Sequence, residues 1–177
     1  KPFLSIAALA AAATLACAPA HALTFEGSIS QGATLVTPYV DTGLLSFDID
    51  FANQSPVVLD LRIDAEDLLQ PITFNAVLRN FTGLGIDAYV LSMDKGSFGT
   101  IGSVTRQFGG TTQIDVAGGD ARLTFSNPEF LDIEIGNPLA VSSGAINWTL
   151  QGLQAGDRIS LSISAVPEPE TWGLLLA

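Results

Sequence analysis

The sequence has little of the residues that carry most enzyme chemistry. It contains one cysteine, Cys17, and one histidine, His21, and both lie within the first 22 residues. If this segment is removed, the remaining chain has neither a thiol nor an imidazole. Such a chain cannot use a catalytic Cys or a Ser-His-Asp triad, and it cannot form disulfide bonds or zinc sites built on His or Cys. Only carboxylate chemistry would be left, so we expect no enzyme that depends on these groups.

Basic residues are also scarce. Seven Lys and Arg stand against eighteen Asp and Glu, which gives a net charge of −11, or −12 if Lys1 is lost with a leader. Proteins that bind nucleic acid need clustered positive charge to neutralise phosphates. We therefore expect no nucleic-acid partner.

The first 22 residues have the pattern of a signal peptide. Lys1 precedes an apolar stretch at residues 6–13, and Ala20-His21-Ala22 supplies the small-x-small sequence that signal peptidase recognises through Ala20 and Ala22. We predict cleavage after Ala22, so that the exported chain begins at Leu23. Two alternatives are a buried helix of the mature fold, and a lipoprotein modified at Cys17.

The last twelve residues carry the most specific motif of the chain. Val166, Pro167, Glu168 and Pro169 are followed by Trp172 and by the apolar run Leu174-Leu175-Leu176. This segment resembles the PEP-CTERM sorting signal of Gram-negative bacteria. The resemblance implies recognition by an exosortase, a membrane enzyme that cleaves near Pro-Glu-Pro and passes the protein to the cell surface or extracellular matrix.

In that family the motif is followed by a hydrophobic helix and a short Arg cluster. The apolar run here reaches only Ala177, whereas a membrane span needs roughly 20 apolar residues. We expect the helix and the basic cluster to follow in a longer chain and to anchor it transiently in the inner membrane. Because Pro167 and Pro169 donate no hydrogen bonds, we expect residues 166–177 to be extended, exposed and separate from the folded domain.

Residues 23–165 have the length of one domain with a sizeable core. Apolar and polar residues alternate through most of it, which is the pattern of strands with one exposed face. The sequence predicts nine to eleven short strands, of which the clearest are at residues 45–51, 57–64, 72–78, 114–116, 123–125, 131–135, 146–150 and 159–163.

Turn signals separate these segments. Residues 116–122 read as a tight Gly-Gly hairpin, and Asn127-Pro128 reads as a turn. One helical turn is expected at residues 65–70, where Pro71 ends it. We therefore predict an all-β fold, an antiparallel two-sheet sandwich with jelly-roll-like wiring.

Acidic clusters are the remaining candidates for chemistry. Asp60, Asp64, Glu66 and Asp67 offer the hard oxygen ligands that calcium prefers, and they predict a structural Ca²⁺ site. The alternative is that these acids, together with the pairs Asp48/Asp50 and Asp132/Glu134, keep strand faces soluble and discourage edge pairing.

Aromatic residues suggest a carbohydrate ligand. Trp148 has the phase of a core residue, whereas Tyr39, Tyr89 and Phe130 are placed to be exposed and to stack on sugar rings. Two carboxylates could also hydrolyse a glycosidic bond.

The expected function is that of an exported, non-enzymatic surface or matrix protein, sorted by an exosortase. Its alternatives are a carbohydrate-binding module of the exopolysaccharide matrix and a secreted glycan-active enzyme.

Overall fold

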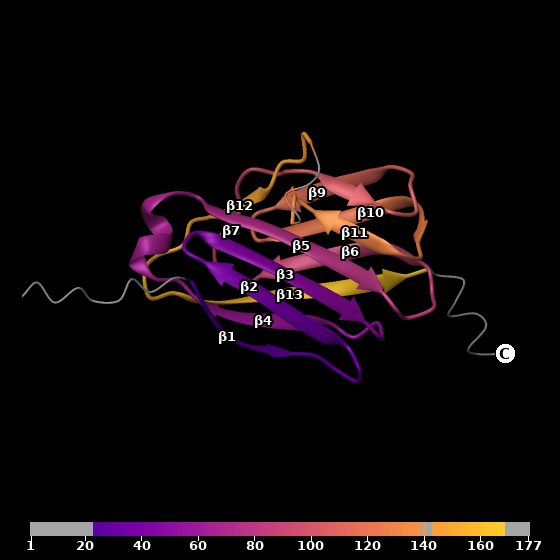
Figure 1. Cartoon of the computed structure of the whole chain (residues 1–177), viewed down its shortest axis with the longest axis horizontal. Coiled ribbons are helices and arrows are strands. Elements are labelled where there is room, and N and C mark those ends of the chain that lie inside the picture. The colour runs from indigo at the N-terminus through magenta and orange to yellow at the C-terminus, as the bar shows by residue number, and fades with distance from the viewer. Residues whose placement is uncertain (1–22, 139, 141–142, 169–177) are drawn as a thin grey trace, which may run out of the picture.

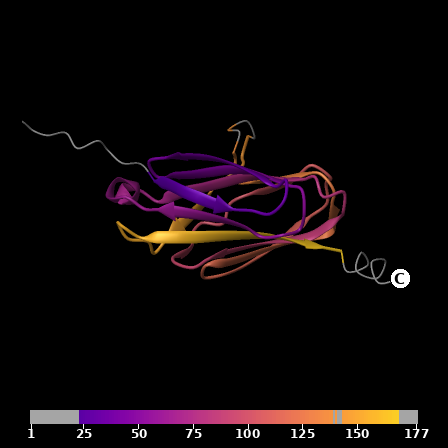
Figure 2. The same cartoon turned by 90° about the horizontal axis from the view of Figure 1, so that it is seen from below.

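The alternating segments form strands whose apolar side chains point to one interior. In β3 (Leu44–Phe51), Phe47, Ile49 and Phe51 are fully buried while Asp48 and Asp50 stay at the surface. A computed structural model describes residues 23–138, 140 and 143–168. Its strands form two packed sheets (Figure 1), and Figure 2 shows these two layers from the side. The predicted all-β sandwich is therefore confirmed.

The first sheet has six strands. Their spatial order is β1 (Thr24–Ile29), β4 (Val57–Arg62), β13 (Arg158–Pro167), β6 (Ile86–Met93), β10 (Asp120–Glu129) and β9 (Thr112–Ala117).

The second sheet has seven strands. Its main path is β2 (Leu35–Asp41), β3, β5 (Ile72–Asn80), β11 (Asp132–Ile135) and β8 (Val104–Arg106), while β12 (Trp148–Gln151) pairs with β5 and with β7 (Ser97–Phe98). The thirteen strands of the described residues exceed the predicted nine to eleven. Strands as short as β7 and β8 cannot show a period of two, so the sequence pattern misses them.

One strand pair departs from the expected antiparallel arrangement. Strands β3 and β5 run parallel, with Leu45 opposite Phe74, and all other pairs in the described residues are antiparallel. The chain returns between them through β4, which belongs to the first sheet. Because β4 runs back in the other layer, β5 enters the second sheet in the same direction as β3.

Two local predictions hold and one is wrong. The Gly118-Gly119 hairpin joins β9 to β10, with Ala117 opposite Asp120, and Gly118 has the left-handed φ of +62° that this turn requires. The short helical turn is the 3₁₀ helix η1 (Ala65–Leu69). Asn127-Pro128 is not a turn: it lies inside β10, where the register with β6 shifts between Thr124 and Glu129. Proline has no N–H for the ladder, so it fits this irregular stretch.

Aromatic residues fill the middle of the sandwich. Trp148 is fully buried, as predicted, and its ring lies 5.4 Å from that of Phe98 and 6.2 Å from that of Phe74. Phe51 and Tyr89 form a second contact at 5.5 Å. Burial of a large apolar side chain stabilises a fold by roughly 1.5–3 kcal/mol, so these rings contribute to the core together with the aliphatic side chains around them.

The two ends of the described chain leave opposite ends of the sandwich. Leu23 precedes β1 at the end where η1 lies, whereas β13 runs to the far end and finishes at Pro167 (Figure 1). Within the described residues, no helix is long and apolar enough to cross a membrane.

Candidate functional site

The four carboxylates of the predicted calcium site do not share one cavity. Asp60 projects from β4 and accepts a hydrogen bond from the Ser160 hydroxyl at 2.7 Å. Asp64 faces the Arg62 guanidinium at 3.5 Å. Glu66 is half-buried in η1. Among the residues described, no three His, Cys, Asp or Glu side chains gather to hold a metal ion.

Asp67 is the exception among these acids, because it is fully buried. Its Oδ1 accepts hydrogen bonds from the backbone N–H groups of Leu23 and Gly43, both at 2.9 Å. Its Oδ2 accepts from the N–H of Asp64, also at 2.9 Å. The side chain therefore ties together the start of β1, the β2–β3 turn and η1. The Asp-x-x-Asp spacing before a helical turn is the sequence signal for such a role.

The outer face of the second sheet carries a charged network. Arg79 on β5 donates to Asp48 at 2.6 Å and to Asp50 at 2.8 Å, both on β3. These two hydrogen bonds raise the pKa of Arg79 above its ordinary value. Asp132 on β11 lies opposite Arg79 in register. Burial raises the pKa of Asp132. The positive charge of Arg79 opposes this shift, and the negative charge of Asp50 adds to it.

A groove of about 340 Å³ opens beside this network. The register places Tyr39, Ser46 and Asn75 in one row across β2, β3 and β5. Tyr39 is 55 % exposed, and Asp48 and Pro138 also line the groove.

Asn75 supplies an unsatisfied acceptor at this groove. Its side chain is 95 % buried, since 5 % remains exposed, and its Nδ2 donates weakly to Asn147 Oδ1 at 3.4 Å. Its Oδ1 has no hydrogen-bond partner among the described residues. Buried acceptors are almost always paired in proteins, and this atom, although unpaired, has almost no surface that a ligand could reach.

The other predicted sugar-stacking residues lie elsewhere. Phe130 is 44 % exposed and contacts Phe108 edge-on at 5.4 Å. Tyr89 is fully buried, so the prediction of an exposed Tyr89 is wrong: its ring packs against Phe51 and Phe125. Burial also raises the pKa of the Tyr89 hydroxyl.

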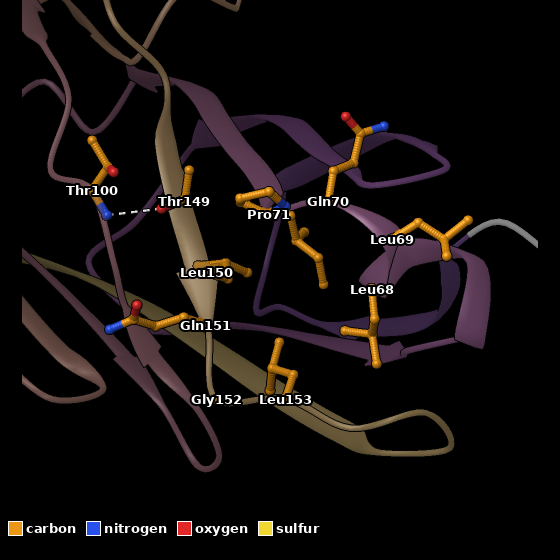
Figure 3. A pocket seen from close by; sticks show the side chains of 11 residues that line it. Leu68, Leu69, Gln70, Pro71, Thr100, Thr149, Leu150, Gln151, Gly152 and Leu153 are labelled. Atoms are coloured by element: carbon orange, nitrogen blue, oxygen red, sulfur yellow. Dashed lines mark hydrogen bonds between the residues drawn. The ribbon is translucent and has the colours of Figure 1, made fainter.

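A second cavity of about 500 Å³ lies between η1 and β12 (Figure 3). Leu68 and Leu69 stand on one side, and Leu150 and Leu153 on the other. Its polar lining is uncharged, and the Thr149 hydroxyl already accepts the N–H of Thr100 at 2.8 Å. The cleft has no acid, base or metal ligand among its lining residues.

The segment predicted to be a sorting motif begins inside the fold. Strand β13 continues past residue 165, with Val166 opposite Ala88 and Pro167 opposite Ile86 beyond a bulge. The N–H of Glu168 donates to the carbonyl of Gly85 at 3.3 Å. The prediction that the segment is exposed and separate from the domain is therefore wrong for residues 166–168, which are half-buried at the sheet end.

Several predicted residues lie outside the described part of the chain. These are Cys17, Ala20, Ala22, Pro169 and Trp172.

Comparison of the chain with protein-family models, with curated proteins and with solved structures gave no match.

Proposed function

We propose that this chain is an exported, non-enzymatic β-sandwich protein of the cell surface or extracellular matrix. Signal peptidase removes residues 1–22, and an exosortase recognises the Pro-Glu-Pro segment while the chain is held at the inner membrane. The mature domain then acts through binding or structure at the surface.

The observation that carries this proposal is the position of the motif at the end of the last strand. Val166 and Pro167 are the final residues of β13, and they lie at the end of the sandwich opposite Leu23 (Figure 1). Cleavage on the C-terminal side of this strand would leave the other strands of the domain intact.

The candidate sites support a non-catalytic role. Asp48 and Asp50 are both engaged by the Arg79 guanidinium, at 2.6 Å and 2.8 Å. The larger cleft is lined by apolar and uncharged side chains. A secreted glycan-active enzyme, the third interpretation, would need an acid and a second carboxylate across one cleft.

The groove beside Tyr39 favours glycan binding as a second candidate function. An exposed aromatic ring can stack on the apolar face of a sugar, and the Asp48 carboxylate, which also lines the groove, can accept hydrogen bonds from its hydroxyl groups. Its volume of about 340 Å³ suits a small-molecule or short-oligomer site. An exopolysaccharide of the matrix is the corresponding partner.

Sorting is tested by replacing Pro167, Glu168 and Pro169 with alanine in the full gene. Since Pro167 is the last residue of β13 and Glu168 follows it, we expect the free energy of unfolding to fall by less than about 1 kcal/mol. The variant should remain uncleaved in the inner-membrane fraction, while Gln154→Ala, an exposed change at the other end, should be sorted normally. Processed variant at the surface would refute the sorting proposal.

Glycan binding is tested with the chain from Leu23 to Ala177 on a glycan array. We expect Tyr39→Ala to weaken binding at least about tenfold, because the stacking platform is lost. Phe130→Ala removes a ring that is 44 % exposed and does not line the groove, and this variant should bind normally. Equal binding by wild type and Tyr39→Ala would exclude this groove.

A further inference from the structure

The buried carboxylate of Asp67 faces the nitrogen atom at which we propose the mature chain to begin. Leu23 N lies 2.9 Å from Asp67 Oδ1. Both residues are almost completely buried, with 2 % of Leu23 and none of Asp67 exposed. The Leu23 side chain belongs to the hydrophobic core, so packing fixes its nitrogen in front of the carboxylate.

Asp67 has no cationic partner in the described part of the chain. Its three hydrogen-bond donors are backbone amides. The nearby side chain of Asp64 is itself negative and faces Arg62, which also approaches Glu26 at 3.9 Å. A buried carboxylate without a cation is costly, and a positive group at hydrogen-bond distance would lower that cost.

We infer that Asp67 is the binding site for the α-ammonium group of the processed chain. Hydrolysis of the Ala22–Leu23 bond adds the hydroxyl of water to the Ala22 carbonyl carbon and a hydrogen to the Leu23 nitrogen. At neutral pH this amine takes up a further proton, because its ordinary pKa is about 7.7–8.0. The amide that donates to Asp67 thereby becomes an ammonium group in the same place.

Leader removal and stabilisation of the domain are therefore coupled. Before cleavage, Leu23 N can offer one neutral N–H to Asp67. After cleavage it offers a charge-assisted hydrogen bond, which is roughly twice as strong as a neutral one. The inference rests on the proposed cleavage after Ala22, but the recognition of the ammonium by Asp67 can be measured separately.

The experiment compares two chains that both end at Ala177. One is released from a fusion directly before Leu23, and the other begins one residue earlier, at Ala22. We expect the Leu23 chain to melt about 4 °C or more above the Ala22 chain. Asp67→Asn should remove this difference, whereas Glu66→Gln, a neighbouring carboxylate in the same 3₁₀ helix, should preserve it. Equal melting temperatures, or a difference that survives Asp67→Asn, would overturn the inference.

A second measurement covers the outcome in which Asp67→Asn does not fold. The α-amine of each folded chain is labelled with a limiting amount of an acylating reagent at neutral pH, and the modified N-terminus is quantified by mass spectrometry. We expect the Leu23 amine to react at least about tenfold more slowly than the Ala22 amine, because its protonated form is held by a buried carboxylate. Equal rates would contradict the inference.

The intact mass of the exported protein tests the processing step by itself. A chain that begins at Leu23 agrees with the proposed cleavage, and a lipid-bearing chain that begins at Cys17 refutes it. The melting and labelling comparisons use chains of defined start, so they test Asp67 whichever bond is cut in the cell.

Discussion

The two ends of the sandwich each bury one carboxylate, and they satisfy it in different ways. At the end where the chain enters, Asp67 accepts three backbone N–H groups. At the end where the chain leaves, Glu129 lies 3.1 Å from the guanidinium of Arg106, with both side chains almost fully buried. Glu129 also accepts the N–H of Leu131 at 3.0 Å.

The difference lies in the source of positive charge. Arg106 donates to the carbonyls of Asn127 and Thr111, and its guanidinium lies 4.6 Å from the centre of the Phe125 ring. At the end where the chain leaves, the positive charge therefore comes from a side chain of the folded domain. This ion pair links β8 of one sheet to β10 of the other. The entry end has no such Arg or Lys among the described residues, and the proposed cation arises only when the leader is cut. In this proposal, the end where the chain leaves is complete in the folded sequence, and the end where it enters is completed by cleavage before Leu23.

The largest effect on this comparison is expected from Arg106→Met. It leaves the buried Glu129 carboxylate without its cation, which typically costs about 3–5 kcal/mol of unfolding free energy. Urea unfolding of the chain from Leu23 to Ala177 measures this loss. Arg158→Met is the control, since the Arg158 side chain that pairs with Glu26 is solvent-exposed and its loss should change the unfolding free energy little.

The double variant Arg106→Met with Glu129→Leu sharpens the same point. Removal of both charges should restore part of the lost stability, because no unpaired buried charge remains. A double variant less stable than Arg106→Met would show that the ion pair is not the reason for the loss.

A smaller effect is expected at the entry end from Gly43→Ala. Gly43 donates its N–H to Asp67 and has a φ of +65°, a left-handed conformation that costs a residue with a Cβ about 1–2 kcal/mol. The added methyl has room, since its nearest neighbours would lie 3.8 Å away, so the strain arises in the backbone. Gly27→Ala, with open space around its Cβ and no left-handed φ, is the matched control and should change the unfolding free energy little. Similar losses for both variants would argue against this account.

The smallest effect is expected from Asp132→Asn at the exit end. The pKa of Asp132 is raised above its ordinary value of 3.8, so the folded chain holds this proton more tightly than the unfolded chain does. Ionisation of Asp132 therefore lowers the free energy of unfolding as the pH rises above about 4. We expect the variant to be more stable than wild type at pH 7, by less than about 1 kcal/mol, and to lose this advantage as the pH falls to 4. Urea titrations at both pH values measure the change, and a variant less stable at pH 7 would contradict the prediction.

Much of the fold can be predicted from the sequence because most of its strands have one solvent-exposed face. Asp48 and Asp50 mark the outer side of β3, while Phe47, Ile49 and Phe51 mark the inner side. Alternation fails where a segment is too short, as in β7, or where a turn signal sits inside a strand, as at Asn127-Pro128. The sequence also does not reveal that Tyr89 is buried, because a tyrosine is compatible with both a core and a surface position.

The sequence alone determined the strand periodicity, the Gly118-Gly119 hairpin, and the excess of acid over base, since each depends on local residue types. The proposed leader and the proposed sorting motif also rest on short linear patterns. Only the tertiary structure decided which acids are exposed, because burial depends on segments far apart in the chain: Asp67 meets Leu23 across 44 residues, and Arg106 meets Glu129 across 23. It likewise decided that Val166 and Pro167, the first residues of the proposed sorting motif, lie inside β13 and pair with β6, which no local pattern could reveal.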